Sequence, residues 1–163
     1  MRSALALAAV LCLGATAFWM GTDGLRAFTA EEARRLAVRE HPQPVPAIAL
    51  EDQYGNRFAL PDLRGKRVLV EFIYTRCRSI CLVLGNTFQQ VRARLAETRA
   101  GTDVVLLSIS FDPRDQNAAL AAHAKMYRAD PKTWIFARAA NPAELPALLH
   151  TFGIIAVRTP DGE

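Results

Sequence analysis

Apolar positions beyond residue 46 alternate between two patterns, one continuous and one with helical spacing. Residues 68–74 and 104–111 are nearly continuous apolar runs, as strands buried on both faces of a sheet require. Between them, large apolar residues recur every three or four positions from Leu84 to Leu95, which predicts an amphipathic helix over residues 80–99. These apolar positions are interpreted as core packing.

The same alternation continues to the end of the chain. Asp112-Pro113 predicts the start of a helix that runs to about residue 128, and a third short strand follows at 133–137. Asn141-Pro142 opens a last helix, and Gly153 closes it. Upstream, residues 47–50 and 57–60 flank a glycine turn and predict a hairpin. Strands that alternate with helices indicate an α/β fold with a mainly parallel central sheet.

The first twenty residues have the pattern of a targeting segment. Met1-Arg2-Ser3 precedes an uncharged run of 17 residues from Ala4 to Met20. This run is either a removable signal peptide or a single membrane anchor, and both deliver the rest of the chain outside the cytoplasm. Residues 21–46 are polar and rich in proline, which predicts an extended stalk. The folded domain is expected over residues 47–163.

Composition narrows the class of protein further. The chain has 163 residues, of which 51% are hydrophobic and 22% charged, and a formal net charge of +4. This fits one globular domain and excludes collagen-like and wholly disordered chains. The basic residues are scattered in ones and twos, without the clustering on one face that nucleic-acid binding needs. We therefore expect no nucleic-acid partner.

Two cysteines remain once Cys12, an apolar residue of the targeting segment, is set aside. Cys77 and Cys81 lie between the first buried strand and the first long helix, where parallel sheets place active sites. They close too small a loop to stabilise a fold, which favours chemistry over structure. The helix N-terminus and flanking Arg76 and Arg78 are expected to favour the thiolate. The pair suits either a disulfide or a soft metal ion, with Cu(I) preferred and Zn a competitor.

Residues 72–81, FIYTRCRSIC, resemble the F-x-Y-T-x-C-x-x-x-C signature of the SCO/SenC proteins. The resemblance extends from about residue 47 to 153 and includes DQYG at 52–55, LRGK at 63–66 and SISFDPRD at 108–115. It implies a thioredoxin-like fold on the periplasmic side of the bacterial inner membrane. It also implies a metallochaperone that binds copper through Cys77 and Cys81 for the copper site of cytochrome c oxidase. Family members also act as thiol-disulfide reductants of that site.

Two departures from the family pattern stand out. Arg78 takes the place of the proline that often follows the first cysteine. The family's third copper ligand, a histidine beyond the last helix, is absent, and the chain ends in an Asp-Gly turn signal, so we expect the C-terminal hairpin to be missing. His41 is interpreted as a linker residue, His123 as a helix-surface residue and His150 as a helix-end cation; none is expected to bind copper.

Three functional hypotheses follow from these residues. The first is a copper metallochaperone whose partner is the copper-site subunit of cytochrome c oxidase or another copper protein. The second is a periplasmic thiol-disulfide oxidoreductase in which Cys77 attacks and Cys81 resolves the mixed disulfide. The C-x-x-x-C spacing favours metal, because thioredoxin-type enzymes use C-x-x-C. A peroxiredoxin is disfavoured because Val70 stands where its motif needs proline. The third hypothesis is a truncated, non-functional fragment. Asp112 is expected either to cap a helix or to act electrostatically at the site.

Overall fold

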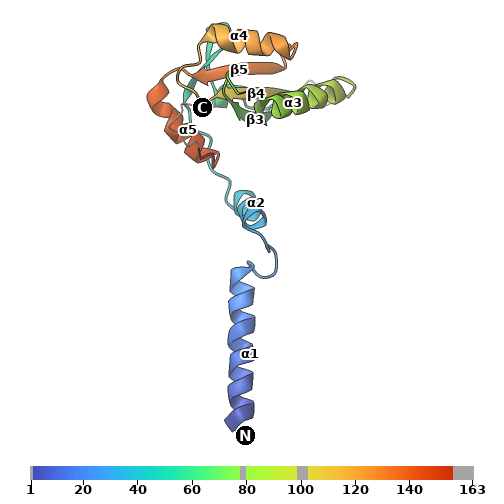
Figure 1. The fold of residues 1–163 in the computed structure, drawn as a ribbon, viewed down its shortest axis with the longest axis vertical. Coiled ribbons are helices and arrows are strands. Elements are labelled where there is room, and N and C mark those ends of the chain that lie inside the picture. Colours follow the sequence, from blue (N-terminus) through green and yellow to red (C-terminus); the bar gives the residue numbers. More distant parts are fainter. Residues whose placement is uncertain (1, 78–79, 99–102, 156–163) are drawn as a thin grey trace. The chain divides into compact units, whose positions relative to one another are not determined.

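A computed structural model describes residues 2–77, 80–98 and 103–155 of the chain, with residues 2 and 80–82 described by their backbone alone. It divides into two compact units, Met1–Pro44 and Val45–Glu163. The first unit holds helices α1 (Arg2–Gly21) and α2 (Ala30–Glu40), and the second holds the sheet and the remaining helices (Figure 1). Each unit is described by itself.

The first unit consists of an apolar helix and a short polar one. Residues Ser3–Gly21 of α1 have a mean hydropathy of 1.9 and are long enough to cross a membrane, by length and composition. Helix α2 begins at a capping box, in which the Thr29 hydroxyl accepts from the Glu32 N–H at 3.1 Å and the Glu32 carboxylate accepts from the Thr29 N–H. This cap gives α2 a defined start.

The second unit is built on a five-stranded sheet in the order β2-β1-β5-β4-β3. The predicted hairpin is confirmed as antiparallel β1 (Ala49–Asp52) and β2 (Arg57–Ala59), and Gly55 in its turn has φ 88°, a left-handed conformation that favours glycine. The three strands predicted from the apolar runs are parallel to one another: β3 (Arg67–Ile73), β4 (Val104–Ser110) and β5 (Trp134–Ala139). The predicted mainly parallel α/β fold is therefore confirmed.

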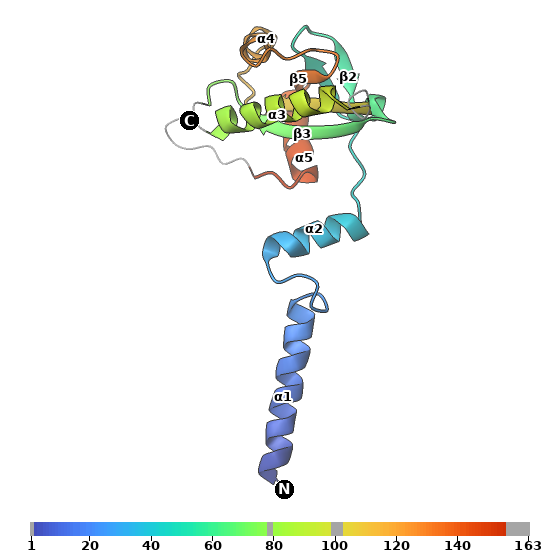
Figure 2. The ribbon, with the colours of Figure 1, turned by 90° about the vertical axis from the view of Figure 1, so that its right-hand side faces the viewer.

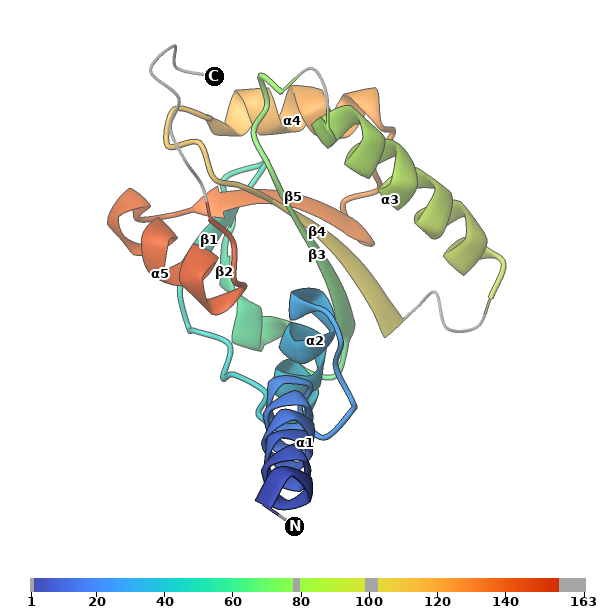
Figure 3. The same cartoon turned by 60° about the horizontal axis from the view of Figure 1, so that its bottom comes forward.

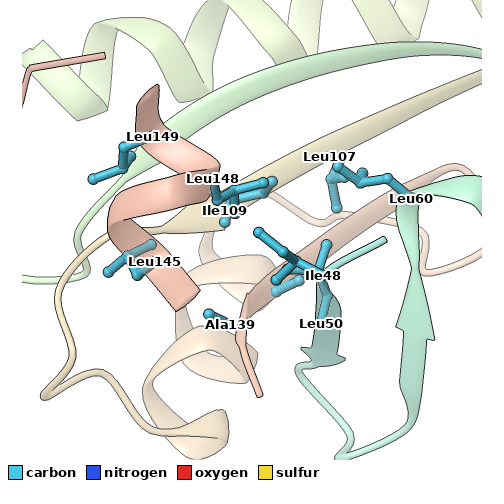
Figure 4. Close-up of a cluster of buried hydrophobic side chains, with 10 residues drawn as sticks. Ile48, Leu50, Leu60, Leu107, Ile109, Ala139, Leu145, Leu148 and Leu149 are labelled. Atoms are coloured by element: carbon cyan, nitrogen blue, oxygen red, sulfur yellow. The ribbon is translucent and has the colours of Figure 1, made fainter. Parts of the chain in front are cut away.

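Helices cover the two faces of this sheet. Helices α3 (Ile80–Ala96) and α4 (Asn117–Met126) lie on one face, over a core that includes Trp134 and Phe136. Helix α5 (Leu145–Thr151), which follows a 3₁₀ turn at Pro142–Glu144, lies on the other (Figure 2). Its leucines pack there against apolar residues of β1 and β4 (Figure 4). Because β3, β4 and β5 are parallel, their C-terminal ends lie at the same end of this three-layer domain.

Two expectations from the sequence are wrong in detail. Strand β3 is not buried on both faces; it lies at the end of the sheet, and Arg67 and Leu69 are exposed. Helix α4 begins at Asn117 and not at Asp112-Pro113. The segment before it is drawn instead toward the end of β3, because Asp115 accepts hydrogen bonds from Thr75. Tertiary hydrogen bonds here outweigh the local helix-start signal.

Candidate thiol and copper site

The site begins where β3 ends, at the edge that carries the C-terminal ends of the parallel strands. A tight turn follows the strand, and the Cys77 N–H donates to the Tyr74 carbonyl at 3.1 Å. Only 4% of Cys77 is exposed. Cys81 lies in the first turn of α3, although its side chain, like all of Arg78 and Ser79, is outside the described part of the chain. The fold thus places one thiol in the loop and the other residue on the helix.

The turn that leads to Cys77 is held by a buried carboxylate. Asp115, which is 3% exposed, accepts hydrogen bonds from the Thr75 N–H at 2.8 Å and from the Thr75 hydroxyl at 2.6 Å. The Ser110 hydroxyl, at the end of β4, donates to it at 2.6 Å. Three donors satisfy the buried charge and tie the β3–α3 loop to the β4–α4 loop.

Asp112 lies nearby between two arginines. Its carboxylate forms ion pairs with Arg76 and with Arg114, whose Nε lies 3.0 Å from Asp112 Oδ1. Burial alone would raise the pKa of Asp112, but hydrogen bonds from Arg114 and Arg76 lower it to about 2. Asp112 is not the N-cap of α4, which is Gln116; its Oδ1 instead accepts from the Arg114 N–H at 2.9 Å. The positive charge expected to favour the Cys77 thiolate is therefore shared with a carboxylate.

A second buried carboxyl group lies deeper, on β3. Glu71 is 6% exposed, and its Oε1 accepts from the Ser108 hydroxyl at 2.5 Å, which in turn accepts from Trp134 Nε1 at 2.8 Å. Glu71 Oε2 has no hydrogen-bond partner within the described residues. Burial raises the pKa of Glu71, and the Ser108 hydrogen bond only partly opposes this shift. The nearly continuous apolar run at residues 68–74 did not predict that its one acidic residue is buried.

The three histidines lie in different environments. The expectation that His123 lies on a helix surface is wrong: it is buried, with its ring centroid 5.3 Å from that of Tyr127 and 5.9 Å from that of Phe136. Burial lowers the pKa of His123, and the charge of Asp115 opposes this shift. His41 and His150 are exposed. No group of three His, Cys, Asp or Glu side chains among the described residues is arranged to hold a metal ion.

A small cavity lies beside Asp112 and Asp115. This cavity, of about 10 Å³, is lined by residues at the ends of β4 and β5, including Ser110, Asp112, Asp115 and Arg138. Its volume suits a single water molecule or ion.

A mainly parallel α/β sheet with a cysteine motif after its first parallel strand is typical of thioredoxin-like proteins. The family model described as SCO1/SenC matches residues 38–163. The chain belongs to the SCO1/SenC family.

Similar proteins support this assignment. The chain is 28% identical over 121 residues to the SCO1 protein homolog of Bacillus subtilis, covering 73% of this chain and 61% of that relative. It thus spans less than two thirds of the relative's length. The BsSco structure, described as revealing a disulfide switch in a Sco family cytochrome c oxidase assembly protein, matches with a TM-score of 0.62 and 28% identity over 72% of this chain and 68% of that one. Copper-bound ScoI of Bradyrhizobium japonicum matches with a TM-score of 0.63 and 27% identity over 74% and 75% of the two chains.

Proposed function

We propose that this protein is a copper metallochaperone that binds copper through Cys77 and Cys81 and delivers it to the copper site of cytochrome c oxidase. The observation that carries the proposal is the placement of the motif. Cys77 is buried directly after β3, and Cys81 lies in the first turn of α3. A loop residue and a helix residue four positions apart can direct two sulfur atoms at one ion.

The chemistry of these groups fits copper as the cargo. Thiolates are soft ligands that prefer Cu(I), and the partial positive charge of a helix N-terminus favours the thiolate form. With two protein ligands, copper would keep a position open for an exchangeable ligand such as water or a small thiol. Such a site suits transfer by thiolate exchange. The copper-bound structure of the B. japonicum relative supports this choice of metal.

The first unit suggests where the protein acts. We infer that residues 1–20 are a signal or a single membrane anchor, that residues 21–46 are a stalk, and that the domain from residue 47 faces the periplasm. Helix α1 supports this proposal by its length and hydropathy. Anchoring would hold the copper site near a membrane-bound recipient.

A Cu(I) titration of the reduced, full-length chain in detergent, in competition with a chromogenic chelator, tests the proposal. We expect wild type to bind one equivalent and a C77S/C81S variant to lose binding, since both soft ligands are removed. The matched control is C12S, because Cys12 is exposed on α1 and is not part of the motif. C12S is expected to bind as wild type does. Equal binding by C77S/C81S and C12S would contradict the proposal.

A thiol-disulfide oxidoreductase is the second candidate function, supported by the disulfide switch described for BsSco. The Cys77 thiolate would attack a substrate disulfide, and Cys81 would then release the reduced substrate dithiol and leave a Cys77–Cys81 disulfide. No metal takes part. A chain that cycles between dithiol and disulfide but binds no copper in the titration above would favour this function over the first.

A further inference from the structure

Two buried residues at opposite ends of α4 hold the two segments that carry the cysteines. The first is Asp115, which precedes the helix. Two of its three accepted hydrogen bonds hold the backbone and the side chain of Thr75, two residues before Cys77, and the third comes from Ser110. Asp115 lies 40 positions from Thr75 in the sequence, so the conformation of the loop before Cys77 depends on a tertiary contact.

The second residue is Tyr127, which ends α4 and is 4% exposed. Gly85, one turn after Cys81 on α3, lies against its ring: a Cβ added at Gly85 would be 2.6 Å from the Tyr127 hydroxyl oxygen and 2.7 Å from Cε1. The Tyr127 carbonyl also accepts from Gln89 Nε2 at 3.3 Å. Only a glycine allows α3 to approach this closely.

The Tyr127 ring has little freedom to move away from α3. It packs against His123 on one side, at 5.3 Å between ring centroids, and against Trp134 at 5.7 Å. Trp134 is fully buried in the core beneath α3 and α4. Figure 3 shows α3 and α4 side by side over the strands. The position of α3, and with it Cys81, therefore depends on a fixed aromatic surface.

We propose that Asp115 and Tyr127 are positioning residues that set the separation of Cys77 and Cys81, with α4 as the common support of both. The inference rests on the proposed use of this cysteine pair. Asp115 places the loop of Cys77, and Tyr127 places the helix of Cys81. Because disulfide geometry tolerates only small changes in Cβ separation, a shift of either segment changes the stability of the disulfide relative to the dithiol.

The test measures the dithiol–disulfide equilibrium of the full-length chain in glutathione buffers. One oxidised glutathione takes two electrons from the Cys77 and Cys81 thiols, yielding the protein disulfide and two reduced glutathione molecules. We expect D115N and G85A each to change the equilibrium constant by about tenfold, equivalent to about 30 mV. D115N places an amide group against the Thr75 donors, and G85A forces α3 away from Tyr127.

Two controls separate positioning from general loss of stability. D52N is the same substitution at an aspartate that also accepts three hydrogen bonds, from Tyr54 and Asn56 in the β1–β2 turn, away from the cysteines. L148A creates a cavity beneath α5 on the opposite face of the sheet (Figure 4) and lowers the melting temperature. Both are expected to keep the wild-type equilibrium constant within about twofold.

The outcomes are distinct. A change in D115N and G85A that is absent from D52N and L148A supports the inference. No change in D115N and G85A, or an equal change in all four variants, overturns it, as does a wild-type chain that forms no Cys77–Cys81 disulfide. If D115N does not fold, T75V carries the same test, because it removes the 2.6 Å side-chain bond and keeps the Thr75 N–H. Since the readout needs no copper, failure of copper binding would refute the proposed function alone.

Discussion

Glu71 places a carboxyl group inside the core of the domain. Its Oε1 receives the Ser108 hydrogen bond, whereas Oε2 has no partner within the described residues. A raised pKa means that the folded protein keeps the Glu71 proton at pH values where the unfolded chain has lost it. Glu71 therefore stabilises the fold at low pH, and that stabilisation is lost as the pH rises from 4.5 through its folded-state pKa.

We expect Glu71→Gln to remove this pH dependence, because the amide has the same shape and stays neutral. Thermal melts between pH 4.5 and 8 would show the E71Q and wild-type melting temperatures diverging as the pH rises, with E71Q melting about 4 °C higher than wild type at pH 8. E97Q is the matched control, because Glu97 is exposed. Wild-type and E71Q curves that stay parallel over this range would contradict the prediction.

Asp112 is a second residue whose charge matters, because its carboxylate lies close to the cysteine loop. It pairs with Arg76, the residue directly before Cys77, and so offsets the positive charge that the sequence places beside the thiol. Removing the carboxylate charge leaves Arg76 uncompensated, which favours the Cys77 thiolate.

We expect Asp112→Asn to accelerate alkylation of Cys77 by iodoacetamide about two- to fivefold at pH 7, because the thiolate is the reactive form. The measurement uses a chain that carries C12S and C81S, so that Cys77 alone reacts. D52N in the same background controls for the loss of a surface carboxylate. An alkylation rate equal in D112N and D52N would refute this electrostatic role.

At the scale of elements, periodicity predicted the order of strands and helices well. The apolar runs gave β3, β4 and β5 within two residues of their observed ends, and α3 starts at Ile80 as expected. These elements were predictable because the spacing of apolar residues within a short stretch of sequence indicates which type of element they form. Trp134 and Phe136, within the predicted third strand, are fully buried.

The errors arise where contacts are remote in the sequence. An apolar run cannot distinguish a central strand from an end strand, so β3 was expected to be buried on both faces. The start of α4 depends on the contact of Asp115 with Thr75, 40 residues away. His123 was misplaced because its alanine-rich neighbours gave no clear apolar face, whereas the sheet residue Phe136 packs against it.

The cysteine motif of the candidate site could be predicted from the sequence, whereas the residues that hold the motif in place could not. The spacing of Cys77 and Cys81 at a strand–helix junction was visible in the sequence. In the sequence, Asp115 stood out only as part of a motif that resembles the family pattern. Its three hydrogen bonds could be identified only from the folded structure. The contact between Gly85 and Tyr127 could not be predicted, because it depends on how two helices pack in the folded domain.

At the scale of the whole molecule, the question is whether the second unit folds without the first. The contacts of the chain divide at residues 44 and 45, and the two core clusters lie wholly in the second unit. Both faces of its sheet are covered by helices, with Leu148 fully buried on one side and Leu120 on the other. A domain of this size with two such cores is large enough to fold cooperatively.

We therefore expect residues 45–163, expressed without the first unit, to melt in a single cooperative transition. The measurement is urea unfolding followed by both far-ultraviolet circular dichroism and Trp134 fluorescence, since Trp19 is absent from this fragment. The two probes should give coincident midpoints. L148A is expected to lower the midpoint with the slope unchanged, because it removes buried apolar volume from a folded core. A broad transition with different midpoints for the two probes would favour the hypothesis of a non-functional fragment over that of a metallochaperone, because a thiol pair can bind copper selectively only where a stable fold holds it.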